Sequence, residues 1–287
     1  MDLEKIIANG IEVTVSNGQI VSMRKSGFEY MHGGGKPDES KTDGDRKGWQ
    51  NSEIVMFPVI GALQRYALLV DHQVCLMDQH GVARNIPFVV KEKEAHKITL
   101  LQSHDGITPI ENQKYAQSTD NPQQLAWPFA YTLEKSVSIL TRHDVTVTFT
   151  LTNASERAMP YEFGWHPAFR CMGPAEKGVF EYHGTKKPLT KRTQEDEGLL
   201  PSGGMSLLST DKVTYSNQDT LRGVTLTSEG FTDITLWCPA AESGMFCIEP
   251  VTRHEHRLQD ENYFHDGHQL LLPKQSATYR ANIRLHY

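Results

Sequence analysis

Apolar and hydroxyl-bearing side chains alternate along one stretch in the middle of this 287-residue chain, and the alternation constrains the fold more than any other feature. In residues 145–153, valine, phenylalanine and leucine take every second position, and threonine takes the positions between them. Successive side chains of a β-strand point to opposite faces, so the pattern predicts a strand with one buried face. Turn-forming residues follow, and the chain returns through Pro160 as a second strand.

Short alternating segments recur along the rest of the chain. Two of them, 11–15 and 19–23, are joined by Asn17-Gly18, a pair that tolerates the positive φ angles of a tight hairpin turn. Many short strands separated by turns favour a large antiparallel β-sandwich. No break in composition marks a boundary, so we predict an all-β fold with a single domain over residues 1–287. The other segments predicted as strands are 95–101, 131–140, 232–237, 245–249 and 278–285.

Polar, glycine-containing segments connect several of these strands. Residues 31–50, 111–124 and 185–205 offer little apolar surface to bury, which is typical of surface loops. The first of these segments could also act as a lid over a pocket.

The charge and the apolar runs of the chain exclude several classes of partner. The formal net charge is −6 and no block of basic residues is present, so neither nucleic acid nor an anionic membrane surface is expected as a partner. No apolar run approaches the roughly 18 residues of a membrane-spanning helix. The N-terminal residues lack the pattern of a signal peptide. We expect a cytoplasmic protein that is a monomer or a homodimer.

The cysteine and histidine spacings do not indicate a metal site. The four cysteines, at positions 75, 171, 238 and 247, form no C-x-x-C pair, and their apolar neighbours predict reduced side chains in the core. His254 and His256 would share one face of a strand, but no second pair of ligands with suitable spacing accompanies them. We therefore predict no bound metal.

His166 occupies an unusual position in the returning strand, between Trp165 and Pro167. Proline removes a backbone donor and biases the preceding residue toward an extended conformation, so the strand should end, kink or lie at an edge near this point. The imidazole is then held at a defined position near a strand end. The alternative is a histidine that only packs in the core.

The segment 145–170, with its F-G-x-H-P-x-F motif, resembles the aldose 1-epimerase (galactose mutarotase-like) family, in particular its shorter bacterial branch. Two more parts of the chain are similar to the same family: F-P-V-I-G at 57–61 with Q-H-G-V-A-R at 79–84, and F-C-I-E-P at 246–250. With a turn at 272–276, the similarity extends over about residues 10–285. It implies a galactose mutarotase-like supersandwich with a shallow sugar-binding groove on one sheet.

The resemblance also implies which residues carry the reaction. Glu249 matches the family's catalytic base, His166 matches its general acid, and His80 matches a second histidine that orients the sugar. Interconverting two anomers needs a base for the proton of the C1 hydroxyl and an acid for the ring oxygen. A carboxyl group with a pKa near ~4.3 is ionised at neutral pH, and an imidazole with a pKa near ~6.5 is readily protonated. No cofactor is needed.

Three further residues are predicted to bind the substrate: Arg84, Arg65 and Trp165. Arg84 could bind a sugar hydroxyl or an anionic substituent, or it could form a structural ion pair beside His80. Arg65 could replace an arginine that relatives carry directly after the glycine of F-P-x-x-G, where this chain has Ala62. Trp165 could stack on a sugar ring or pack in the core.

Other candidates for binding the sugar remain open. Trp237 and Phe169 have the same two alternatives as Trp165, stacking on a sugar or core packing. The family's sugar-binding aspartate has candidate positions at Asp211, Asp219 and Asp233.

The sequence therefore predicts an aldose 1-epimerase, an isomerase whose partner is a small-molecule sugar, an aldohexose. One alternative is a hexose-6-phosphate 1-epimerase, which would need a cationic pocket built from Arg65, Arg84 and Arg170. The other is a non-catalytic sugar-binding or regulatory protein, because function belongs to the site and not to the scaffold. Retention of both a base and an acid argues against a protein that only binds.

Overall fold

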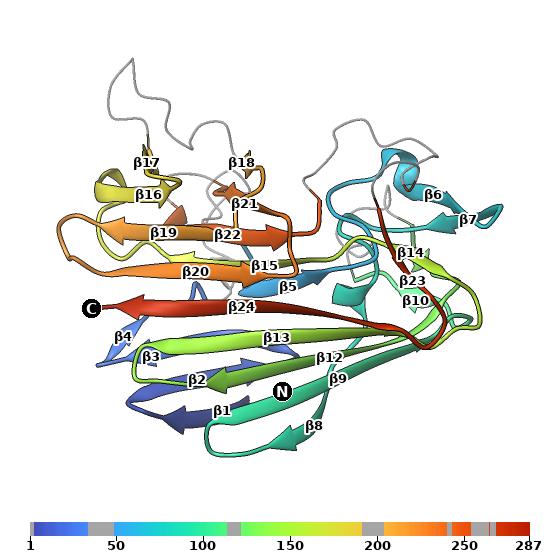
Figure 1. Ribbon diagram of the computed structural model, residues 1–287, viewed down its shortest axis with the longest axis horizontal. Coiled ribbons are helices and arrows are strands. Elements are labelled where there is room, and N and C mark those ends of the chain that lie inside the picture. The colour runs from blue at the N-terminus through green and yellow to red at the C-terminus, as the bar shows by residue number, and fades with distance from the viewer. Residues whose placement is uncertain are drawn as a thin grey trace.

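The structure, a computed structural model, describes residues 3–33, 49–113, 122–190, 204–239, 243–253, 264 and 268–287 (Figure 1). Its regular elements are almost all strands, and the predicted all-β antiparallel sandwich is confirmed. None of the helical segments in these ranges is long and apolar enough to span a membrane. The described 3-10 segments are Gln64–Tyr66, Ala83–Asn85 and Ala175–Lys177.

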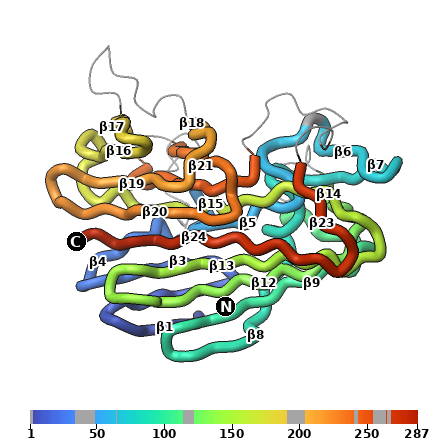
Figure 2. Tube along the Cα trace, in the orientation of Figure 1, coloured from blue at the N-terminus to red at the C-terminus, as the bar shows by residue number. Residues whose placement is uncertain are grey.

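The largest sheet has nine strands. They are β8 (Val89–Lys93), β9 (Lys97–Asp105), β12 (Ala130–Ile139), β13 (Asp144–Asn153), β16 (Gly178–Tyr182), β17 (Thr185–Pro188), β19 (Lys212–Asn217), β20 (Gly223–Glu229) and β24 (Ser276–His286). Their order across the sheet is β17-β16-β19-β20-β24-β13-β12-β9-β8, with antiparallel neighbours throughout. Figure 1 shows the red β24 between the orange β20 and the green β13, and the tube in Figure 2 follows the same arrangement.

A second sheet has five strands and carries the segments that the sequence analysis singled out. They are β5 (Glu53–Met56), β15 (Gly164–Arg170), β18 (Gly204–Leu207), β21 (Asp233–Trp237) and β22 (Met245–Val251). The order is β18-β21-β22-β15-β5, so β15 lies between β22 and β5. The F-G-W-H-P and F-C-I-E-P segments are thus neighbours in space.

Four smaller sheets complete the strand pairing of the described residues. The largest has four strands in sequence order, and the turn between its second and third strands has positive φ at both Asn17 (50°) and Gly18 (78°). The predicted N-terminal hairpin is confirmed. The strands are β1 (Leu3–Ala8), β2 (Ile11–Ser16), β3 (Gln19–Lys25) and β4 (Phe28–Glu29), and the pairs β6 (Ala67–Val70) with β7 (Gln73–Leu76), β10 (Ile110–Glu111) with β11 (Gln124–Leu125), and β14 (Met159–Tyr161) with β23 (Gln269–Leu271).

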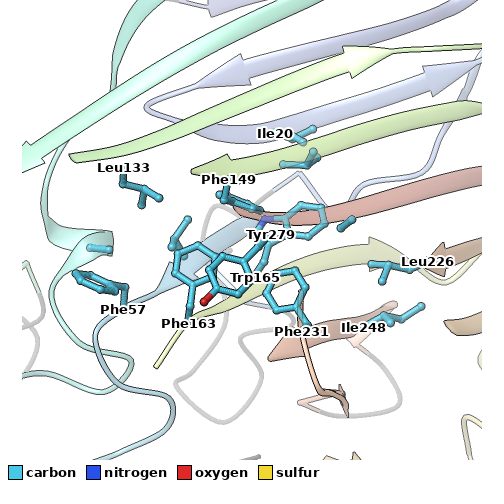
Figure 3. Close-up of a cluster of buried hydrophobic side chains, with 14 of the residues drawn as sticks. Ile20, Phe57, Leu133, Phe149, Phe163, Trp165, Leu226, Phe231, Ile248 and Tyr279 are labelled. Carbon is cyan, nitrogen blue, oxygen red and sulfur yellow. The ribbon is translucent and has the colours of Figure 1, made fainter. Parts of the chain in front are cut away.

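Large apolar side chains pack between the nine-stranded and the five-stranded sheets (Figure 3). Phe149 of β13 lies against Trp165 of β15, with ring centroids 5.8 Å apart, and Phe163 stacks on Tyr279 of β24 at 4.5 Å. One core cluster takes in residues from the first strand to the last. The inner face of the five-stranded sheet therefore belongs to the core, and its outer face is available for a site. The assignment of one domain to residues 1–287 stays a prediction.

The segments predicted from alternation all form strands, and one predicted loop is partly wrong. Residues 185–188, expected in a polar loop, form β17 at the edge of the nine-stranded sheet. Their backbone pairs with β16, and this pairing needs no apolar face. In the predicted lid at 31–50, residues 34–48 lie outside the described residues.

Candidate active site

β15 and β22 bring His166 and Glu249 together. Gly164 pairs with Val251, and the antiparallel register then puts His166 opposite Glu249 on the same face. Nε2 of His166 lies 3.3 Å from Oε1 of Glu249, and the two side chains are 8% and 6% exposed. The predicted acid and the predicted base, which come from two distant motifs, are therefore neighbours on one sheet.

Pro167 does not end β15, which continues to Arg170 with neighbours on both sides. The expected irregularity takes another form. Backbone pairing with β22 is present at Gly164 and from Ala168 onward, and is interrupted at the residues between them. A proline cannot donate to the ladder, which accounts for the gap at this position.

Burial decides the charge of His166. Loss of solvent contact, with a smaller effect from the positive charge of Arg84, lowers the pKa of His166 to about 3. This effect opposes the expectation that the imidazole is readily protonated near neutral pH, because the water that would solvate an imidazolium is excluded. A neutral imidazole still has one N–H to donate.

Two tryptophans flank His166. The ring of Trp49 stacks on the imidazole with centroids 4.4 Å apart, and Trp237 of β21 meets it edge-on at 5.5 Å. Trp237 was an open candidate from the sequence, whereas Trp49 was missed. The one signal for Trp49 was that it is the only aromatic residue in the polar segment 31–50.

His80 lies on a tight turn beside this pair. Its ring centroid is 5.7 Å from that of His166, and its Nδ1 accepts the backbone N–H of Gly61 at 3.0 Å. The next residue, Gly81, has φ of 79°, and a Cβ there would meet the backbone oxygen of Phe57 at 2.2 Å. The turn predicted from His80-Gly81 therefore requires glycine, and it holds the His80 ring close to His166.

The two predicted substrate arginines differ in their surroundings. Arg84 forms an ion pair with Asp78, and the two side chains are 10% and 1% exposed, which matches the structural alternative for Arg84. Arg65 lies in the 3-10 segment that follows the F-P-x-x-G motif, and its side chain is exposed. Ala62, which comes directly after the glycine of that motif, is also exposed. Arg65 is not drawn into the buried pair at His166.

Trp165 cannot stack on a ligand at this site, so its assignment to substrate binding is wrong. It is fully buried in the core cluster, on the opposite face of β15 from His166. Phe169, four residues after Trp165 on the same strand, points to the same face and packs against Phe246 in the core, with ring centroids 5.8 Å apart. The physical reason is the alternation of the strand, which sends adjacent side chains to opposite faces.

A buried ion pair lies behind His166, on the core side of the sheet. Glu53 and Lys135 are each 1% exposed and contact each other. The Glu53 carboxylate also accepts the indole N–H of Trp165 and the backbone N–H of Ile20, and Lys135 donates to the Gly18 oxygen at 2.7 Å. Burial lowers the pKa of Lys135, while Glu53 opposes this effect. The network ties the N-terminal hairpin and β12 to the strand that carries His166.

The three candidate aspartates lie in different places. Asp233 begins β21 of the five-stranded sheet, and its Oδ1 accepts the backbone N–H of Ser209 at 2.9 Å. Asp211 and Asp219 are exposed beside β19 of the nine-stranded sheet. Only Asp233 among these three lies on the sheet of the candidate site. His254 and His256 fall outside the described residues.

None of the four cysteines forms a disulfide, as predicted. Cys75, Cys238 and Cys247 are buried, and Cys171 is half-buried. Burial raises the pKa of the Cys247 thiol well above its ordinary value, and the neighbouring Glu249 carboxyl adds to the effect. The thiol is therefore protonated at neutral pH.

Glu162 is another buried glutamate near β15, and we expect it to make stability depend on pH. Burial raises its pKa to about 7, although Arg253 lies 3.4 Å away. A carboxyl group whose pKa is higher in the folded protein than in the unfolded chain, where it is near 4.5, stabilises the fold most at pH values below 4.5. This stabilisation is lost as the pH rises through 7. Glu162→Gln cannot ionise, so its stability relative to the wild type should rise between pH 5 and pH 8.

The expected relative gain is about 1–3 kcal/mol, since a tenfold change in an ionisation constant corresponds to about 1.4 kcal/mol. Urea unfolding of both proteins at the two pH values measures it, and every other titrating group cancels in the difference. An unchanged difference between pH 5 and pH 8 would contradict the raised pKa.

The comparisons with known proteins agree on one family. The model of the family described as aldose 1-epimerase matches residues 64–213, which is more than half of the chain and includes His80 and His166. Protein LacX (chromosomal) of Lactococcus lactis is 23% identical over 298 residues, covering 91% of this chain and 90% of LacX.

Solved structures give the same fold. A galactose mutarotase-like protein from Lactobacillus casei matches with a TM-score of 0.77 at 19% identity, covering 99% of this chain and 100% of its own. A galactose mutarotase related enzyme from Lactobacillus acidophilus matches with a TM-score of 0.76 at 17% identity, covering 100% and 98%. These structures support the fold, and the match to the family model supports the family. The chain belongs to the aldose 1-epimerase family.

Proposed function

We propose that this protein is an aldose 1-epimerase that interconverts the α and β anomers of an aldohexose without a cofactor. The observation that carries the proposal is the pair formed by Glu249 and His166, 3.3 Å apart on one face of the five-stranded sheet. Membership of the family supports an isomerase that acts on a sugar. Burying a carboxyl group and an imidazole costs desolvation free energy, and a protein that only binds sugar has little need of the pair.

Each residue of the pair has a role in ring opening. Glu249 accepts the proton of the C1 hydroxyl while the bond between C1 and the ring oxygen breaks. The electron pair of that bond goes to the ring oxygen, where the neutral imidazole of His166 donates its N–H to the developing charge. The proton on Glu249 then passes to the ring oxygen. Rotation about the C1–C2 bond and the reverse steps give the other anomer.

The side chains around the pair suit a pyranose. Trp49 and Trp237 offer aromatic rings next to His166, and the apolar faces of a sugar can pack on such rings. His80, oriented by its hydrogen bond to Gly61, is close enough to His166 to contact the same ligand. These groups would position the sugar and exclude water from the reacting oxygens.

The surroundings favour a free sugar over a sugar 6-phosphate. Of the three arginines that a phosphate pocket would need, Arg84 is paired with Asp78 and Arg65 is exposed. Arg170 lies four residues beyond His166 on the same face of β15. That spacing corresponds to about 13 Å of backbone along a strand, so Arg170 is not an immediate neighbour of the pair formed by His166 and Glu249.

Polarimetry of freshly dissolved α-D-glucose and α-D-galactose tests the proposal. The purified protein should speed the change in optical rotation above the buffer rate, in proportion to its concentration. α-D-glucose 6-phosphate should gain no larger acceleration than the free sugars. A buffer rate with all three substrates, at protein concentrations where direct binding of a sugar is measurable, would favour the non-catalytic alternative.

The pH profile tests the charge of His166. With the pKa of this imidazole lowered to about 3 by burial, it stays neutral across the range where an ordinary histidine titrates. The profile of kcat/KM reports the essential groups of the free enzyme, so it should show no inflection near pH 6.5. A loss of kcat/KM as pH rises through 6.5 would instead indicate a catalytic imidazolium and contradict the neutral donor.

A further inference from the structure

A third side chain with metal-binding chemistry lies beside the acid-base pair. Cys247 precedes Glu249 by two residues in β22 and therefore points to the same face. One ring nitrogen of His166, the sulfur of Cys247 and one carboxylate oxygen of Glu249 all lie within 4.8 Å of one another. All three side chains are buried. The proposed epimerisation has no use for a thiol at this position.

The spacing of the three groups suits a small cation. Ligand atoms about 2.0–2.3 Å from a tetrahedral zinc ion lie roughly 3.3–3.7 Å from one another. Nε2 of His166 and Oε1 of Glu249 are already 3.3 Å apart. The sulfur would have to move by about 1.5 Å at most to complete the set. One thiolate, one imidazole and one carboxylate leave a fourth position for water, and the thiolate selects against Mg²⁺ and Ca²⁺.

We propose that His166, Cys247 and Glu249 form a binding site for a thiophilic divalent cation such as Zn²⁺, and that the bound ion inhibits the enzyme by occupying the position of the sugar's reacting oxygens. Binding breaks the S–H bond of Cys247, the sulfur electron pair forms the bond to the metal, and the proton passes to solvent. No oxidant or reductant takes part. The inhibition rests on the proposed epimerase function, whereas the binding does not.

Cobalt serves as the spectroscopic probe for the site. Full-length protein, freed of any histidine tag and treated with a chelator, is titrated with CoCl₂ and then with ZnCl₂. A near-ultraviolet band from thiolate-to-cobalt charge transfer should appear, saturate at one ion per chain and disappear when Zn²⁺ is added. Cys247→Ser should lose the band and bind Zn²⁺ at least about tenfold more weakly, since even changes outside the ligand set have effects of that size.

Cys238→Ser is the matched control. Cys238 is buried nearby, but it belongs to the core cluster, and its sulfur lies 3.1 Å from the backbone oxygen of Met245. This variant should keep the cobalt band. Cys247→Ala replaces the serine variant if the latter does not fold. The proposed site would be overturned if the wild type showed no cobalt band. It would also be overturned if Cys238→Ser lost the band while Cys247→Ser kept it.

Inhibition is measured separately by polarimetry. Zn²⁺ should raise the apparent KM for the sugar without changing kcat, and Cys247→Ser should need at least about tenfold more Zn²⁺ for the same inhibition relative to its own metal-free rate. Inhibition that is equal in both proteins would overturn the inhibitory role. A protein that binds cobalt through Cys247 but shows no epimerase activity would keep the metal site and refute the proposed function, and an active protein without the band would do the opposite.

Discussion

Replacing Glu249 with glutamine should lower kcat for sugar epimerisation by about 10³-fold, within the usual contribution of a positioned general base. The amide has nearly the shape of the carboxylate but cannot accept the proton of the C1 hydroxyl. KM should change by less than about threefold, because an interaction that matters only in the transition state leaves ground-state binding in place. Polarimetry over a range of α-D-glucose or α-D-galactose concentrations, whichever is the better substrate, gives both constants.

Glu162→Gln is the matched control for this variant. Glu162 is 1% exposed, is also a glutamate, and pairs with Arg253, whereas Glu249 lies beside His166. Its replacement should leave kcat within about threefold of the wild type, as expected for a residue outside the reacting groups. Equal losses in the two variants would point to damage from removing any buried carboxyl group. Full activity in Glu249→Gln would refute its assignment as the base.

Replacing Lys135 with methionine should destabilise the protein by about 3–5 kcal/mol, the usual result of leaving one partner of a buried ion pair alone. Glu53, whose side chain is 1% exposed, would keep its hydrogen bonds from Trp165 and Ile20 but lose the cationic partner of its buried ion pair. Urea unfolding followed by tryptophan fluorescence gives the free energy and the midpoint. The m value should stay constant, since the surface exposed on unfolding changes little.

Two comparisons separate the buried charge from lost packing. The double variant Lys135→Met with Glu53→Gln should recover at least about 1 kcal/mol, because the amide removes the unpaired charge and keeps an acceptor oxygen. Lys91→Met breaks the exposed ion pair with Glu134, whose side chains are 53% and 35% exposed, and should move the midpoint far less. Similar shifts from Lys91→Met and Lys135→Met would contradict a special role for the buried pair.

The alternation of side chains predicted several strands of this fold, including β12, β13, β22 and β24, but it missed others and could not predict how they are arranged. β13 has one apolar and one hydroxylated face, so its sequence carries a period of two. β17 lies at an edge and is held by backbone pairing with β16, which leaves no such pattern. The position of β24 between β20 and β13 depends on pairings between residues that are distant in the sequence, such as Gly223 with His286 and Asp144 with Arg284, and no local pattern records them.

The site shows the same division between local and distant information. The motifs around His166 and Glu249 named the pair that the sheet brings together, through their similarity to a family. The order Trp165-His166 requires only that the two side chains point apart, and it does not say which one faces the core; the packing of Phe149 decides that. Trp49 reaches His166 from a segment with no strand pattern, so only the structure could join them.

The central position of β24 has a consequence for how the protein is made. Without it, the group β8, β9, β12 and β13 shares no backbone pairing with the group β16, β17, β19 and β20. A chain still attached to the ribosome cannot close this sheet before residues 276–286 have left the exit tunnel, so β13 and β20 are synthesised with open edges that could pair with another nascent chain. The threonines on the outer face of β13 keep that face of the strand polar until β24 has been synthesised and can pair with it.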